Sequence, residues 1–247
     1  MGGIVPAQIK LTAMRQFEQI LPARFLDIPT QLWHSVALGG HAFRVAAYSY
    51  AISRAYGFDE NSAQQLRQAS MFHDIGKLFI PEKLLEKPTV LSPKEHLKVQ
   101  QHTLKGHELL EKSSNPILQK AAVIALHHHE YLDGSGYPNG LSGAEIPLVA
   151  RLVSVADVFD ALTSERVYRP ALSQRQTVAF IKRASAGQFD PMVVDALLSI
   201  IETHPDLPTH LQAITEIGSD IVTCHTRDES AALSPVQLIE TWDAYLN

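Results

Sequence analysis

The stretch His127–Pro138 reads HHHEYLDGSGYP and places three consecutive histidines directly before an acidic, glycine-rich loop. The apolar run AAVIAL precedes the histidines, so we expect them at the end of a buried helix. His128 and His129 would cost helix propensity and desolvation at this position, and metal coordination explains that cost better than a structural role does. Because successive helical residues point about 100° apart, one histidine should face away, and we assign that position to His127.

Other histidines and carboxylates stand along the chain at His73-Asp74, His102 and Asp157. A carboxylate beside an imidazole can bind one metal ion and bridge to a second through its other oxygen. Two such ions about 3.5–4 Å apart activate a water and clamp phosphoryl oxygens. The pattern therefore predicts phosphodiester hydrolysis. The alternative for His73-Asp74 alone is a helix end with a favourable cation near the helix dipole.

Composition limits the other classes of function. A chain of 247 residues, 45% of them hydrophobic, favours one globular domain with appendages. No membrane span or signal peptide is indicated, so we expect a cytoplasmic protein. A lone Cys224 leaves histidine and carboxylate as metal ligands, which suit Fe, Mn, Ni, Co or Zn. The net charge of −5 argues against a nucleic acid polymer as partner.

Apolar residues recur at helical spacing almost throughout, which predicts an all-α core. The sequence SPKE from Ser92 is a capping box with proline in the first turn, and similar signals precede the helices expected after Ser173 and Asp190. The loop 133–147 is too rich in glycine and proline for a helix. We expect helices at about 7–21, 31–56, 60–73, 92–112, 117–130, 148–163, 173–187 and 190–203, and a closing helix from Ser234.

The ordered motifs together resemble the HD-GYP family, a branch of the HD superfamily of metal-dependent phosphohydrolases. They are HDIGK at 73–77, HTLKG at 102–106, HHE at 128–130, DGSGYP at 133–138 and ADVFDALT at 156–163. The resemblance implies an HD-superfamily helical bundle with the additional helices of the HD-GYP type. It divides the chain into an N-terminal helical extension (1–33), a catalytic domain (34–203) and a C-terminal extension (204–247).

The resemblance also implies the roles of individual residues. Asp74 would bridge two divalent transition metal ions, with Fe or Mn favoured, and act in catalysis together with Lys77, which would contact the scissile phosphate. The implied metal ligands are His41, His73, Asp74, His102, His128, His129 and Asp157. The implied substrate contacts are Lys77, Asp160, Arg166, Arg169, Gly136, Tyr137 and Pro138. A structural turn is an equal alternative for the Gly-Tyr-Pro triplet, and solvated surface charge is an alternative for both arginines.

The implied reaction is hydrolysis of cyclic di-GMP to linear pGpG through a hydroxide that bridges the metals. Some family members carry a glutamate that helps to hold a third metal, and Ala37 stands at that position here. The absence of this glutamate favours two bound metals and hydrolysis of only one phosphodiester bond, so that GMP forms slowly or not at all. Two alternatives stay open: a cyclic-dinucleotide-binding signalling module with low turnover, and a hydrolase of another cyclic dinucleotide such as cyclic GMP-AMP. The sequence also leaves open a homodimer and a protein partner at the Gly-Tyr-Pro loop or the terminal extensions.

Overall fold

The structure is a computed structural model, and it describes residues 40–165, 170–209 and 211. Within these residues the chain is helical, and its only β pairing is in two isolated bridges. The predicted all-α class is confirmed. The elements are α3 (Gly40–Tyr56), α4 (Glu60–Ser70), η2 (Ile75–Phe79), α5 (Glu82–Leu85), α6 (Pro93–Leu110), α7 (Pro116–His127), η3 (Gly143–Glu145), α8 (Leu148–Thr163), α9 (Gln174–Ala184) and α10 (Pro191–Thr203).

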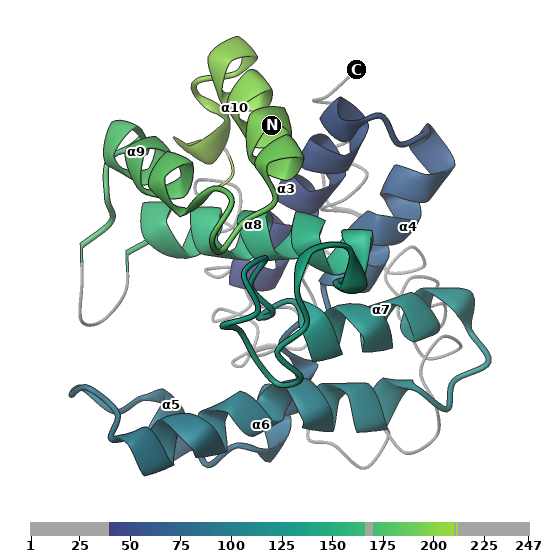
Figure 1. Cartoon of the computed structure of the whole chain (residues 1–247), viewed down its shortest axis with the longest axis vertical. Helices are drawn as coiled ribbons and strands as arrows, with labels where there is room; N and C mark the ends of the chain where they lie inside the picture. The colour runs from purple at the N-terminus through teal and green to yellow at the C-terminus, as the bar shows by residue number, and fades with distance from the viewer. Residues whose placement is uncertain (1–39, 166–169, 210, 212–247) are drawn as a thin grey trace, which may run out of the picture.

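Helix α8 crosses the middle of the molecule, with α9 and α10 on one side and α7 on the other (Figure 1). Helix α3 packs against α4, α8 and α10, while α6 packs against α7 and η2. One core of buried apolar side chains joins these elements, including Ile52 of α3, Ile124 of α7 and Phe159 of α8. The functional site can therefore draw residues from helices that are distant in the sequence.

The predicted starts of α4, α6, α7, α8, α9 and α10 agree with the structure to within one residue, and the start predicted near residue 31 lies outside the described residues. Ser92 and Ser173 form capping boxes, and the carboxylate of Asp190 accepts a hydrogen bond from the backbone N–H of Met192. Four helices end earlier than predicted. Helix α6 ends at Leu110 instead of residue 112, and α9 ends at Ala184 instead of residue 187. Helix α4 ends at Ser70 instead of residue 73, and α7 ends at His127 instead of residue 130. His73-Asp74 and His128-His129 therefore lie in the turns that follow these helices.

Gly76 allows η2 to lie directly against the backbone of α6. A Cβ atom at this position would lie 1.8 Å from the carbonyl oxygen of His102 and 2.5 Å from the backbone nitrogen of Gly106. Both distances are far shorter than any van der Waals contact, so only glycine fits. This close approach brings Asp74, which precedes η2, beside His102 of α6.

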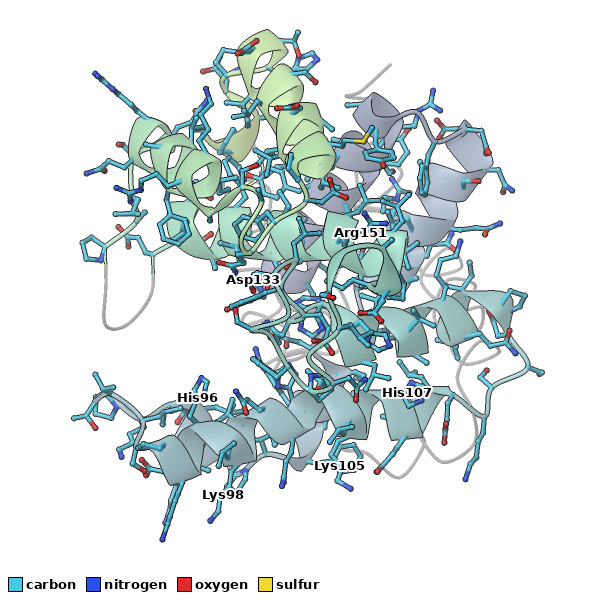
Figure 2. The ribbon with its side chains drawn as sticks, viewed as in Figure 1. His96, Lys98, Lys105, His107, Asp133 and Arg151 are labelled. Atoms are coloured by element: carbon cyan, nitrogen blue, oxygen red, sulfur yellow. The ribbon has the colours of Figure 1, made fainter. Side chains whose placement is uncertain are left out.

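Helix α6 carries three histidines with different surroundings. His102 is buried and faces the interior, whereas His96 is exposed. His107 lies on the side that faces α7 and donates from Nδ1 to the carbonyl oxygen of Ala122, at 3.2 Å. Lys98 and Lys105 point from α6 away from the other helices (Figure 2). The helix is therefore amphipathic, and His102 is the one of its three histidines that is buried in the interior of the protein.

Several expectations concern residues that the structure does not describe. The helix at 7–21, the boundary at residue 33, Ala37 and the closing helix from Ser234 lie outside the described residues. In the segment expected as the C-terminal extension, Leu207 and Leu211 pack against the core. No helix among the described residues is long and apolar enough to span a membrane. The proposed domain division stays a prediction.

Candidate metal centre

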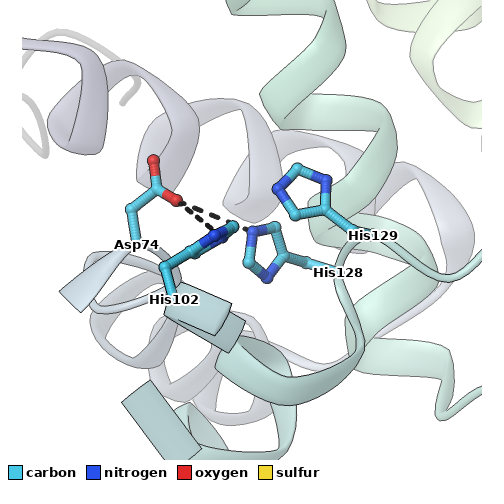
Figure 3. Close-up of side chains that lie close together, drawn as sticks. All are labelled: Asp74, His102, His128 and His129. Atoms are coloured by element: carbon cyan, nitrogen blue, oxygen red, sulfur yellow. Dashed lines mark ion pairs between the residues drawn. The ribbon is translucent and has the colours of Figure 1, made fainter. Parts of the chain in front are cut away.

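The first group of ligand atoms comes from three parts of the chain that the fold brings together. Asp74 precedes η2, His102 lies on α6, and His128 and His129 follow α7 (Figure 3). One ligand atom from each of these four residues lies within 4.8 Å of the others. Oδ1 of Asp74 is 3.3 Å from Nε2 of His102 and 3.8 Å from Nε2 of His128. Imidazoles and a carboxylate in this arrangement are suited to a divalent transition metal.

A second group adjoins the first and shares Asp74 with it. His41, His73 and Asp74 each offer a ligand atom within 4.8 Å of the other two. Oδ2 of Asp74 lies 3.4 Å from Nε2 of His73, so the two carboxylate oxygens face different groups. Oδ1 of Asp157 lies 3.1 Å from Nε2 of His41 and 3.9 Å from Nε2 of His73. Six of the seven expected ligands therefore fall in the two groups that share Asp74, and the seventh, Asp157, lies beside His41 and His73.

Three of the imidazoles are oriented by the backbone. The Nδ1 atoms of His73, His102 and His128 lie 2.9, 2.7 and 3.0 Å from the carbonyl oxygens of residues 70, 99 and 124. Because a carbonyl oxygen can only accept, Nδ1 carries a proton, and in the neutral imidazole Nε2 keeps its lone pair. All three Nε2 atoms are buried and lack a hydrogen-bond partner. A buried polar atom without a partner is costly, and a bound cation would satisfy all three.

The local electrostatics favour the ligand forms of these side chains. Burial lowers the pKa of His102 to about 4 and holds the pKa of His129 well below its usual value. Burial opposes ionisation of Asp74, but Lys77 and His73 outweigh it and hold the pKa of this carboxyl group well below its usual value. His102 and His129 are therefore neutral and the carboxylate of Asp74 is ionised near pH 7, as metal coordination requires.

His41 differs from His102 and His129. Burial alone would lower the pKa of His41, but hydrogen bonds to Asp157 and Asp160 raise it to about 9. In the metal-free protein this imidazole is therefore protonated near pH 7. A cation that binds at Nε2 of His41 has to displace a proton.

Lys77 is half-buried at the edge of the centre, and its Nζ donates to Oδ2 of Asp74. The expected contact between Lys77 and a scissile phosphate stays a prediction. Arg166 and Arg169, which we expected to contact substrate, lie outside the described residues.

Asp160, which we expected to contact substrate, is buried against residues of α3. Its side chain is only 1% exposed, and Oδ2 lies 2.7 Å from Nδ1 of His41. Its other oxygen, Oδ1, accepts a hydrogen bond of 2.6 Å from Nε of Arg44. Both oxygens are therefore engaged inside the protein, and the expected contact between Asp160 and substrate stays a prediction.

The Gly-Tyr-Pro triplet contacts the metal centre through its middle residue. The ring of Tyr137 stacks on His129, and Pro138 follows through a cis peptide bond. A Cβ atom at Gly136 would lie 2.3 Å from the backbone nitrogen of Tyr131 and 2.5 Å from the carbonyl oxygen of His129. The glycine therefore lets the loop fold back onto the chain that carries the ligand, and the triplet has a structural role whether or not it also binds substrate.

Glu130 is a residue whose role the sequence reasoning missed. Its buried carboxylate accepts hydrogen bonds from the backbone N–H groups of Asn139, at 2.8 Å, and Leu141, at 3.1 Å. It therefore ties the loop to the end of α7. The sequence signal that could have identified Glu130 is the position of its carboxylate directly after His128-His129. His127 belongs to neither group of ligand atoms, as expected, and its Nδ1 lies 3.8 Å from Oε1 of Glu130.

Comparison with known proteins agrees with this geometry. The HD domain family matches residues 32–193, which include every residue of both ligand groups. The chain belongs to the HD-domain family. Its relatives include proteins named cyclic di-GMP phosphodiesterases, in agreement with the predicted resemblance.

Two curated relatives of this HD-domain chain carry different substrate names. It is 43% identical over 155 residues to the cyclic di-GMP phosphodiesterase response regulator RpfG of Xanthomonas campestris, which covers 63% of this chain and 41% of that protein. It is 39% identical over 160 residues to 3'3'-cGAMP-specific phosphodiesterase 2 of Vibrio cholerae, which covers 65% of this chain and 31% of that protein. The chain thus spans less than half the length of either relative.

Among solved structures, an HDG"Y"P protein from Bdellovibrio bacteriovorus shares the fold of this HD-domain chain. The TM-score is 0.54 at 22% sequence identity, and the match covers 66% of this chain and 51% of the other. The likeness supports the helical HD fold alone.

Proposed function

We propose that this chain is a metal-dependent phosphodiesterase that hydrolyses cyclic di-GMP to linear pGpG. The observation that carries the proposal is the position of Asp74, whose two carboxylate oxygens face two adjoining groups of histidine ligands. Relatives named cyclic di-GMP phosphodiesterases add support. We place the activity in the cytoplasm as part of the same proposal.

The cofactor in this proposal is a pair of divalent transition metal ions, with Fe or Mn favoured and Ni, Co or Zn as alternatives. Asp74, His102, His128 and His129 would hold one ion, and His41, His73, Asp74 and Asp157 would hold the other. When bound, such a pair supplies an activated water and neutralises charge on phosphate oxygens. The protein contributes rigid ligands, because Nδ1 of His73, His102 and His128 is fixed by backbone carbonyls.

Lys77 is the residue that we propose as the partner of the reacting phosphate. Its ammonium group is half-buried beside Asp74, where a cation could offset the negative charge that develops on a phosphate. Arg166 and Arg169 remain proposed substrate contacts, since a guanidinium group suits phosphate and the acceptor edge of guanine. Tyr137 is placed beside the metal ligands and is the member of its triplet best situated for contact with substrate.

A second candidate substrate is 3'3'-cyclic GMP-AMP. The relative from Vibrio cholerae that is named as specific for this dinucleotide is 39% identical, a value close to the 43% for the cyclic di-GMP relative. A binding module with low turnover is a third candidate, and the complete ligand set disfavours it.

Product analysis across several cyclic dinucleotides tests the proposal. Protein loaded anaerobically with Mn or Fe is incubated with cyclic di-GMP, 3'3'-cyclic GMP-AMP and cyclic di-AMP, and the products are followed by chromatography. We expect linear pGpG to accumulate from cyclic di-GMP, with GMP slow or absent, and Asp74→Ala to abolish the reaction. Faster cleavage of cyclic GMP-AMP would change the substrate, and tight binding without any product would favour the binding module.

A further inference from the structure

The ligand histidines differ in what holds them. His73, His102 and His128 are each oriented by a backbone carbonyl that lies only three or four residues earlier in the chain. These contacts are set by local helix and turn geometry. His41 instead relies on a side chain from another helix, because its Nδ1 lies 2.7 Å from Oδ2 of Asp160 in α8.

Arg44 fixes the position of Asp160. It lies one turn after His41 on α3, and its guanidinium group donates from Nε to Oδ1 at 2.6 Å and from Nη2 to Oδ2 at 3.1 Å. Both side chains are buried, with Arg44 8% and Asp160 1% exposed. A guanidinium group stays charged in proteins and matches a carboxylate in two-point geometry. Arg44 therefore keeps Asp160 as a carboxylate in a fixed orientation.

The orientation of Asp160 decides which nitrogen of His41 is free for a ligand. A carboxylate that is bound to Arg44 can only accept, so the nitrogen that faces it, Nδ1, carries a proton. The opposite nitrogen, Nε2, then points to Oδ1 of Asp157, 3.1 Å away, on the side of the metal centre. Carboxylate partners of ligand histidines act in this way in many metal sites.

We propose that Arg44 and Asp160 form a positioning pair that presents Nε2 of His41 and selectively supports the metal held by His41, His73 and Asp74. This inference rests on the proposed metal binding. The other group, Asp74 with His102, His128 and His129, has His102 and His128 oriented by backbone carbonyls and does not need the pair. The two halves of the centre should therefore respond differently to the same substitution.

The test is a metal titration of the Asp160→Asn variant. An asparagine at this position must present its NH₂ group either to Arg44 or to His41, and both of these are donors, so one hydrogen bond is lost. Metal-stripped protein is titrated with Mn²⁺, and bound ions are counted by elemental analysis and distinguished by electron paramagnetic resonance. A coupled pair of ions and an isolated ion give different spectra.

We expect wild-type protein to bind two Mn²⁺ ions with a coupled spectrum. The Asp160→Asn variant should keep one ion at wild-type affinity and bind the second about 10–100-fold more weakly, as is typical for partners of ligand histidines. At limiting Mn²⁺ its spectrum should be that of an isolated ion.

Two further variants separate positioning from folding. The double variant Arg44→Met/Asp160→Leu removes both buried charges together, which is often neutral for stability, and should weaken the same single ion. Arg151→Met is the matched control, because Arg151 lies on α8, as Asp160 does, and pairs with Asp190, and neither Arg151 nor Asp190 belongs to a ligand group (Figure 2). It should bind both ions as wild type does.

Three outcomes would overturn the inference. Unchanged affinity for both ions in Asp160→Asn, together with a raised KM for cyclic di-GMP, would make Asp160 a substrate contact and leave the proposed function intact. Equal weakening of both ions would remove the selectivity that we infer. Failure of folded wild-type protein to bind any metal would overturn the proposed function as well. If Asp160→Asn does not fold, the double variant decides between these outcomes.

Discussion

The ring of Tyr137 stacks on the imidazole of His129, with ring centroids 4.8 Å apart and 28° between the ring planes. This contact joins the Gly-Tyr-Pro loop directly to a proposed metal ligand. The loop is also held in place by Glu130, whose carboxylate accepts hydrogen bonds from two backbone N–H groups of the loop. A substitution in the loop should therefore change the affinity of the centre for metal.

Replacing Tyr137 tests this connection. Tyr137→Ala removes the stacking on His129, which is worth about 0.5–1.5 kcal/mol for an aromatic pair, so retention of a metal against a chelator should fall about two- to tenfold. Tyr137→Phe keeps the ring and should retain metal as wild type does. If the phenylalanine variant loses as much metal as the alanine variant, the hydroxyl group and not the stacking matters. Competition titration with a coloured chelator measures both.

Gly76→Ala should destabilise the fold strongly. The added Cβ atom would lie 1.8 Å from the carbonyl oxygen of His102, so η2 has to move away from α6. Overpacking typically costs about 1–3 kcal/mol and occasionally more, and we expect the upper end or beyond. Denaturant unfolding of metal-stripped protein measures this cost. In the control Gly187→Ala the nearest atoms are 3.8 and 3.9 Å from the new Cβ, and little change is expected.

Removal of metal should lower the melting temperature. The buried Nε2 atoms of His73, His102 and His128 lack hydrogen-bond partners, so a bound cation stabilises the folded state. Free metal at a hundred times its Kd would add about 2.7 kcal/mol. Thermal unfolding with and without a chelator measures the difference. His127→Ala should keep this difference and His128→Ala should reduce it, and an equal loss in both would contradict our assignment of the facing histidine.

Metal binding should release a proton near pH 7.5. The pKa of His41 is raised to about 9, above its unfolded value, so this side chain is protonated in the metal-free protein below that pH. Because the proton must leave before a cation binds, affinity for one of the two ions should rise about tenfold per pH unit below pH 9 and then level off. Calorimetry in two buffers with different ionisation enthalpies counts the protons. His41→Ala should release about one proton fewer.

Lys77→Ala should reduce turnover of cyclic di-GMP about 10²–10³-fold, the usual effect of removing one electrostatic stabiliser. Metal content should stay unchanged. Steady-state kinetics and elemental analysis of the same preparation measure the two quantities. Lys105→Ala, on the outer side of α6, is the matched control and should be neutral (Figure 2). A loss of metal that parallels the loss of rate would make Lys77 a residue that holds Asp74.

The sequence by itself predicted the helical class, the helix starts and the ligand set. Helix starts are readable because a cap such as Ser92 satisfies backbone N–H groups within its own first turn. The ligand set was implied by the resemblance to the HD-GYP family, whose motifs are mostly contiguous, and six of its seven members fall in the two groups of ligand atoms. The membership of the HD-domain family is confirmed on the same residues.

The tertiary structure decided where helices α4 and α7 end and what Asp160 does. The periodicity of apolar residues predicts that the two helices continue through His73 and His129. In the structure both helices end earlier. After α4 the chain packs η2 closely on α6, and after α7 the Gly-Tyr-Pro loop packs on His129. On the sequence, Asp160 shares a helix face with Asp157 and resembles a second site residue. Its carboxylate is instead bound by Arg44, 116 residues away, and a local pattern cannot contain a partner at that distance.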